Sequence, residues 1–286
     1  MSDSELPVTI PPKRERGARR SRARQIVAAR LEKLEDLSIS KLVPSTLTLL
    51  GLCSGATAIR YAVMEQWQIA VTCVVFAMIF DVLDGRAARM LGADTRFGAQ
   101  LDSLADLVSF GVAPAVIMYT WSLSRMGTAG WVAALIFCAC SAIRLARFNV
   151  QSVRDEGARK SNPYFTGLPT PAAACMMLLP MLISFQWDGA LVREPWIVGT
   201  MIAITSALMV SRLPTPSVKH MRLSREHRFL AGVCGGILVM LLVIWPWATL
   251  TIGLLIYVAT IPVAAVVHHP AAKHERAAAS RKINPA

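Results

Sequence analysis

Charged residues are scarce in this chain: 17% of its 286 residues are Asp, Glu, Lys or Arg, against about 25% in an ordinary soluble domain. Apolar residues make up 54%. They gather in runs of roughly 18–22 residues, which are long enough to cross a hydrocarbon core about 30 Å thick. This composition excludes a soluble globular protein with one core, and it also excludes a disordered chain.

The chain also lacks clustered cysteines and a cleavable signal peptide. Its six cysteines lie inside apolar runs and form no Cys-x-x-Cys or Cys/His cluster with the spacing of a zinc site. We interpret them as small buried apolar residues, which indicate no redox compartment. The long apolar runs exclude a disulfide-stapled secreted domain. Residues 1–41 are polar and basic, and they contain no apolar stretch of the signal-peptide kind.

Eight apolar segments predict membrane-spanning helices, so the expected fold is an all-α, polytopic bundle in a membrane. A Trp245-Pro246-Trp247 turn separates the last two, because proline breaks a helix and tryptophan suits a membrane interface. The segments cover roughly 42–62, 67–85, 99–121, 128–147, 165–186, 195–212, 228–245 and 248–267.

The basic residues predict the orientation of these spans. Of the 30 lysines and arginines, 27 fall on the side of the amino terminus, and only Arg60, Arg125 and Arg193 fall on the other. Because cytoplasmic loops carry an excess of Lys and Arg, both termini are expected in the cytoplasm, and the membrane is expected to be the cytoplasmic (inner) one. The same bias accounts for the net charge of +12 without nucleic acid.

The two ends of the chain are basic. Within residues 19–38, Val27, Leu31 and Leu34 follow helical spacing after a run of arginines. This pattern is typical of an amphipathic helix on the membrane surface, although a solvated basic tail has the same composition. The residues beyond Pro270 are expected to form a disordered tail.

Four aspartates interrupt the apolar pattern where the second span ends and the third begins. An Asp at the centre of a span costs about 2.5–3.5 kcal/mol on insertion scales. Asp81 and Asp84 are three residues apart, and Asp102 and Asp106 are four apart, so each pair shares one helix face. A short loop joins the two helices, and the pairs are therefore expected to face each other across one cleft.

This set of oxygen ligands, with no His or Cys, suits Mg²⁺ or Mn²⁺, and it has room for two ions. Solvated helix ends and a proton relay are the alternatives. Four acids on two facing helices, with no Lys in the loop, disfavour solvated ends. A proton relay does not account for Gly85 and Gly98, which clear the acid-bearing faces for a ligand. Arg89 lies one turn beyond Gly85 and is placed to pair with a phosphate. The alternative for it, as for Arg86 and Arg96, is a loop arginine on the cytoplasmic side.

Residues 81–106 read D-x-x-D-G-x-x-A-R-x8-G-x3-D-x3-D. This pattern resembles the signature of the CDP-alcohol phosphatidyltransferase family with every spacing kept. The resemblance implies a six-helix membrane core, divalent metal ions held by the acids, and transfer of a phosphatidyl group from a CDP-linked lipid to a hydroxyl group with release of CMP. A homodimer is implied as well.

The resemblance also implies roles for individual residues. Metal ligation falls to Asp81, Asp84, Asp102 and Asp106, of which Asp106 would also be the general base. Upstream, Pro44-Ser-Thr-Leu-Thr48 resembles the P-N-x-x-T start of the family's first span, with Ser45 in place of Asn. The implied CDP-binding residues are Thr48, Gly85, Ala88, Arg89 and Gly98.

Two later stretches resemble the phosphatidylserine synthase branch of the family. These are Arg144-Leu-Ala-Arg147-Phe-Asn149 and the segment from Phe165 to Ala172. The branch implies CDP-diacylglycerol and L-serine as substrates. Arg144 and Arg147 share a helix face and, with Asn149, are candidates for binding the acceptor or a lipid phosphate. The alternative for both arginines is anchoring at the cytoplasmic interface.

The predicted organisation has four parts. These are a basic cytoplasmic tail (1–41), a catalytic core of six spans (42–213), two further transmembrane helices (214–268) and a second basic tail (269–286). Three other functions stay open from the sequence. They are the same transfer to glycerol 3-phosphate, inositol phosphate or choline, a membrane transporter that uses intramembrane acids, and a non-catalytic scaffold.

Overall fold

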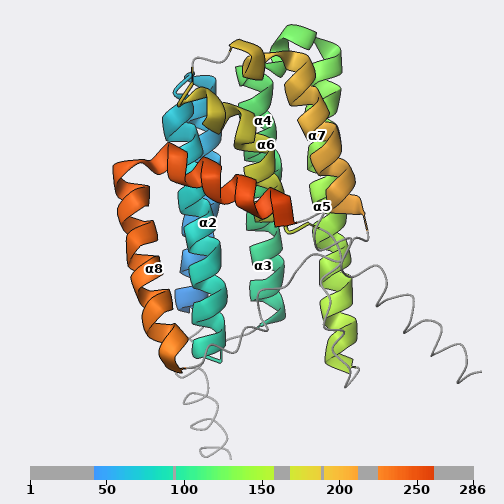
Figure 1. Ribbon diagram of the computed structural model, residues 1–286. Coiled ribbons are helices and arrows are strands. Elements are labelled where there is room, and N and C mark those ends of the chain that lie inside the picture. Colours follow the sequence, from blue (N-terminus) through green and yellow to red (C-terminus); the bar gives the residue numbers. More distant parts are fainter. Residues whose placement is uncertain (1–41, 93–94, 158–167, 188–189, 212–224, 261–286) are drawn as a thin grey trace, which may run out of the picture.

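The computed structural model describes residues 42–92, 95–157, 168–187, 190–211 and 225–260. Within these ranges every regular element is a helix (Figure 1), which confirms the expected all-α fold. The predicted surface helix at 19–38 and the tail beyond Pro270 lie outside the described residues.

Four of the described helices are long and apolar enough to cross a membrane, which agrees with a multi-pass membrane protein. Two of them extend beyond the apolar runs that predicted them: α2 ends at Met90 and α5 ends at Gly157. The extension of α2, residues 86–90, is rich in Arg and Ala, which favour the helix once the apolar run has ended. The four are Leu42–Val63, α2 (Trp67–Met90), Arg96–Trp121 and α5 (Thr128–Gly157).

The third long helix has three parts: α3 (Arg96–Asp106), a π-helical segment η1 (Leu107–Val112) and α4 (Ala113–Trp121). At η1 the first helix comes very close. The Ser109 hydroxyl donates a hydrogen bond to the Gly51 carbonyl oxygen over 3.2 Å, and a Cβ atom at position 55 would lie 2.3 Å from Ser109 Oγ. This approach requires glycine at residue 55, and it holds the first helix against the acid-bearing part of the molecule.

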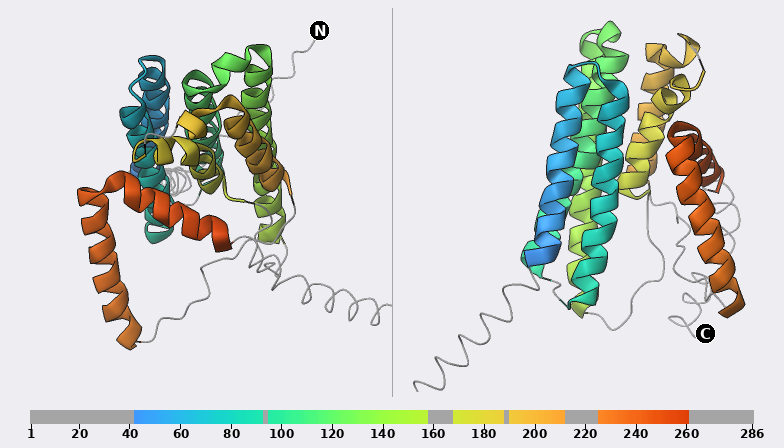
Figure 2. Two further views of the ribbon diagram at one scale, coloured as in Figure 1. Left: turned by 45° about the horizontal axis from the view of Figure 1, so that its top comes forward. Right: turned by 90° about the vertical axis from the view of Figure 1, so that its left-hand side faces the viewer.

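The later apolar segments form shorter helices: α6 (Thr170–Ser184), α7 (Pro195–Val210), α8 (Arg225–Ile244) and Pro246–Thr260. The predicted break at Pro246 is confirmed, since α8 ends at Ile244 and the next helix begins at Pro246. Proline is tolerated as the first residue of a helix. The helix Pro246–Thr260 does not run alongside its neighbours. It crosses the bundle obliquely, as Figures 1 and 2 show in red.

The best-packed core lies among η1, α4, α5, α6 and α7. Its largest fully buried side chains include Phe110, Ile117, Phe137, Met177 and Ile202. Many outward-facing side chains are large and apolar, as expected for helices surrounded by lipid. The acid-bearing α3 lies at the other end of the third long helix from α4 (Figure 1), and a cavity beside it leaves room for a site.

Candidate active site

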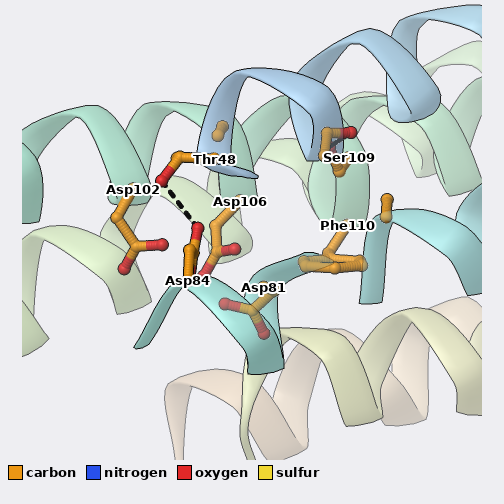
Figure 3. Close-up of a pocket in the computed structure, with 10 residues that line it drawn as sticks. Thr48, Asp81, Asp84, Asp102, Asp106, Ser109 and Phe110 are labelled. Carbon is orange, nitrogen blue, oxygen red and sulfur yellow. Dashed lines mark hydrogen bonds between the residues drawn. The ribbon is translucent and has the colours of Figure 1, made fainter. Parts of the chain in front are cut away.

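The structure brings three of the four predicted acids together. Asp81 projects from α2, and Asp102 and Asp106 project from α3 (Figure 3). One carboxylate oxygen of each lies within 4.8 Å of the others, and all three side chains are half-buried. The helical spacing that predicted two facing pairs therefore accounts for this cluster.

Asp84 makes a different contact. Its side chain is 4% exposed and accepts a hydrogen bond from the Thr48 hydroxyl over 2.6 Å. Figure 3 shows this bond linking α2 to the first helix. The sequence placed Thr48 among the CDP ligands, and its contact with a motif acid was not predicted. A buried carboxylate needs such a donor, because an unpaired one is costly.

The acids border a small pocket whose other walls are apolar or weakly polar. None of the residues that line it is Lys, Arg or His. Sequence reasoning missed Gly51, Ala77, Ala105, Ser109 and Phe110, which complete the lining. Only the spacing of small residues along the first helix could have indicated Gly51, since the others lie in ordinary apolar runs.

The cluster fits one divalent cation. Two ligands on opposite sides of an ion bound at about 2.0–2.6 Å are about 4–5 Å apart. The oxygens of Asp81, Asp102 and Asp106 lie within 4.8 Å of one another, and oxygen ligands are those that Mg²⁺ and Mn²⁺ prefer. Asp84 is turned toward Thr48 and is not part of this group of three.

A much larger cavity, of about 1000 Å³, opens beside the acids. All five predicted CDP-binding residues line it: Thr48, Gly85, Ala88, Arg89 and Gly98. Arg89 folds back along α2 and donates from Nε to the Gly85 carbonyl oxygen over 2.9 Å. The cavity is therefore lined by both carboxylates and arginines.

The start of α3 shapes another wall of this cavity. Thr95 caps the helix, and its hydroxyl oxygen accepts a hydrogen bond from the Gly98 N–H over 3.0 Å. A Cβ atom at position 98 would lie 3.1 Å from that oxygen, so glycine suits the cap. Threonine just before a helix is a recognisable capping signal, so this cap was predictable from the sequence.

The three residues assigned to the acceptor or a lipid phosphate go to different places. Asn149 lines the large cavity and accepts a hydrogen bond from the Ser103 hydroxyl over 3.0 Å. Arg147 donates to the Val210 carbonyl oxygen at the end of α7 over 3.2 Å. Arg144 donates to the Thr170 hydroxyl at the start of α6 and is close enough to Asp106 for an electrostatic interaction.

These features define a multi-pass helical membrane enzyme with an acidic site at the ends of two neighbouring helices. Residues 41–211 match the family model described as CDP-alcohol phosphatidyltransferase. The chain belongs to the CDP-alcohol phosphatidyltransferase family.

Two relatives named CDP-diacylglycerol–serine O-phosphatidyltransferase illustrate the similarity. The protein from Mycobacterium leprae is 34% identical over 226 residues, which are 78% of this chain and 74% of that one. The protein from Helicobacter pylori is 35% identical over 182 residues, which are 63% of this chain and 74% of that one. The apo crystal structure of phosphatidylinositol phosphate synthase from Mycobacterium tuberculosis aligns with a TM-score of 0.43 and 25% identity, over 62% of this chain and 93% of that one.

Proposed function

We propose that this protein transfers the phosphatidyl group of CDP-diacylglycerol to the hydroxyl group of L-serine, giving phosphatidylserine and CMP. The observation that carries the proposal is the three-carboxylate cluster of Asp81, Asp102 and Asp106 beside a cavity lined by the rest of the family signature. The names of the relatives from Mycobacterium leprae and Helicobacter pylori support serine as the acceptor.

The large cavity is the proposed site for the CDP group. Its size suits a nucleoside diphosphate, and its glycines leave space close to the backbone. Arg89 would exchange its contact with Gly85 for one with a phosphate oxygen. Ala88 and Thr48 complete the wall, and the acyl chains extend into the surrounding lipid.

Asp106 is the proposed general base. Its carboxylate takes the proton from the serine hydroxyl, and the oxygen then forms a bond to the phosphorus that carries the diacylglycerol. The bond from that phosphorus to the oxygen of CMP breaks, and CMP leaves with that oxygen. Asp106 suits this role because it lies one turn deeper along α3 than Asp102 and borders the small pocket beside the large cavity.

The acidic residues are the proposed holders of Mg²⁺ or Mn²⁺. Asp81, Asp102 and Asp106 would bind one ion, and rotation of Asp84 away from Thr48 would supply a ligand for a second. Bound metal would neutralise the diphosphate and the departing CMP.

The proposed setting is the cytoplasmic membrane, with both termini and the active site on the cytoplasmic side. The charge bias of the loops supports this orientation. Residues 42–213 form the proposed catalytic core and 214–268 an accessory part, with basic tails at 1–41 and 269–286. The functional unit is proposed to be a homodimer.

The test is CMP release by the purified protein with CDP-diacylglycerol and one acceptor at a time. L-Serine is expected to support rapid release, whereas glycerol 3-phosphate, inositol phosphate and choline are not. Release that depends on one of these other acceptors, and not on serine, would contradict the proposal. The variant Thr57→Val is a suitable control, because Thr57 is exposed and donates within its own helix, to the Cys53 carbonyl oxygen.

A further inference from the structure

The last described helix, Pro246–Thr260, lies outside residues 41–211, the part of the chain that matches the family model. It is nevertheless fixed to the bundle along one face. The residues of that face recur at helical spacing and pack against the core or are buried in it: Trp247, Leu250, Thr251, Leu254, Tyr257 and Val258.

Contacts at the end of α6 set the direction of this helix. The Trp247 ring meets the Phe185 ring edge-on, with centroids 4.8 Å apart. Gln186 Nε2 donates to the Thr251 hydroxyl oxygen over 2.8 Å. From there the helix crosses the bundle obliquely, and Tyr257 lies within electrostatic range of Cys175 in α6 and of Arg144 in α5.

Arg144 is the centre of an incompletely satisfied polar cluster. One Nη donates to Thr170, but the buried Nε has no hydrogen-bond partner among the residues that the structure describes. The buried hydroxyls of Ser141 and Ser206 also lack partners there. Buried donors of this kind are rare in native proteins, and a bound group can supply the missing partner.

The three unpartnered groups lie near one another along the bundle. Ser141 and Arg144 are one turn apart in α5. Arg147 in α5 contacts the carbonyl of Val210 in α7. One turn earlier in each helix stand Ile143 in α5 and Ser206 in α7. Ser206 is therefore level with Arg144.

We propose that Arg144 and Tyr257 form a subsite for the carboxylate of the amino-acid acceptor, and that the helix Pro246–Thr260 supplies Tyr257 to position the guanidinium. A guanidinium binds a carboxylate through two parallel N–H groups, one of which can be Nε. The phenol oxygen of tyrosine can accept from an arginine while its proton is donated elsewhere. The proposal rests on the proposed function.

The span from Arg144 to Asp106 suits a molecule of the size of serine. Arg144 lies within electrostatic range of Asp106, so a ligand that spans the two is a small one. In serine two carbon atoms separate the hydroxyl oxygen from the carboxylate carbon. With the carboxylate on Arg144, the hydroxyl group is directed toward Asp106, the proposed base.

The test is the steady-state kinetics of Tyr257→Phe, which removes only the hydroxyl oxygen. We expect the KM for L-serine to rise about tenfold or more, with kcat and the KM for CDP-diacylglycerol within about twofold of the wild type. L-Alanine has the carboxylate but no hydroxyl, so it is expected to compete with serine and to lose affinity by the same factor. Arg144→Lys retains the charge but lacks Nε, and it is expected to give the same split if Tyr257→Phe does not fold.

Tyr119→Phe is the matched control, because Tyr119 is half-buried and stacks edge-on against Trp131, with centroids 5.1 Å apart, in another part of the bundle. An unchanged KM for serine in Tyr257→Phe, or a parallel loss in all parameters, would contradict the subsite while leaving the proposed function intact. If wild-type protein releases CMP only with acceptors that lack a carboxylate, the proposed function fails and the subsite fails with it.

Discussion

The four aspartates of the signature do not have equivalent surroundings. Asp81, Asp102 and Asp106 are half-buried and share one cluster, whereas Asp84 is 4% exposed and bonded to Thr48. Removal of each carboxylate is therefore expected to have a different effect.

Asp106→Asn is expected to lower turnover by about 10²–10⁴-fold, the usual cost of losing a general base. It keeps the size and one oxygen of the side chain, so CDP binding is expected to survive. Asp84→Asn is expected to weaken CDP binding and metal affinity together. Calorimetric titration with CDP, alongside CMP release at saturating metal, measures both. Near-native turnover in Asp106→Asn would assign the base to another group.

Thr48→Val is expected to lower the free energy of unfolding by about 1.5–3 kcal/mol, because it removes a hydrogen bond to a charged group. The Asp84 carboxylate would be left buried without that donor. Thermal unfolding in detergent measures the change. Thr57→Val is the matched control and is expected to change the stability little. Equal midpoints for the two variants would show that the Thr48 contact contributes nothing.

Among the helices, the close approach of the first helix to η1 has the clearest sequence requirement. A Cβ atom at position 55 would lie 2.3 Å from Ser109 Oγ and 2.6 Å from Ser109 Cα. The backbone must therefore move if residue 55 is anything but glycine, and the Ser109 bond to Gly51 would be disturbed.

Gly55→Ala is accordingly expected to destabilise the protein by about 1–3 kcal/mol through overpacking. Gly235→Ala in α8 is the control, because a Cβ atom there would meet nothing within 4 Å. Alanine favours a helix over glycine by up to about 1 kcal/mol, so this control is expected to be neutral or slightly stabilising. A Gly55→Ala protein with an unchanged unfolding midpoint would contradict the tight contact.

Local patterns predicted the helices well, and contacts between distant residues explain what they missed. Hydropathy located the starts of the long helices and the break at Pro246, since both depend on neighbouring residues. The Thr48–Asp84 bond joins residues 36 positions apart, and nothing local indicates it. Hydropathy also gave a length for the last helix but not its oblique direction, which contacts with Phe185 and Gln186 determine.

Arg144 and Arg147 show the same limit at the site. Their spacing placed them on one face of α5, and a shared function was a reasonable prediction. In the structure one contacts Thr170 of α6 and the other the end of α7. A helix face is wide enough to touch two neighbours, so shared periodicity does not guarantee a shared ligand.

For the molecule as a whole, the proposed orientation places the acidic site in the cytoplasm. Met90 at the end of α2 is 86% exposed, and Leu191 near the opposite end of the bundle is 75% exposed. Single cysteines at these positions, in a protein without its native cysteines, can be labelled in intact cells with a membrane-impermeant maleimide. Labelling is expected at Leu191→Cys and, only after permeabilisation, at Met90→Cys. The reverse pattern would overturn the orientation.

The central claim is that the cluster of Asp81, Asp102 and Asp106 is the metal-dependent centre of phosphatidyl transfer. The most direct measurement is CMP release from CDP-diacylglycerol and L-serine after removal of divalent cations with EDTA, followed by titration with Mg²⁺ or Mn²⁺. We expect release to stop on chelation and to return on titration, with a higher metal requirement in Asp102→Asn. Undiminished release in EDTA, or an unchanged metal requirement in Asp102→Asn, would contradict the claim.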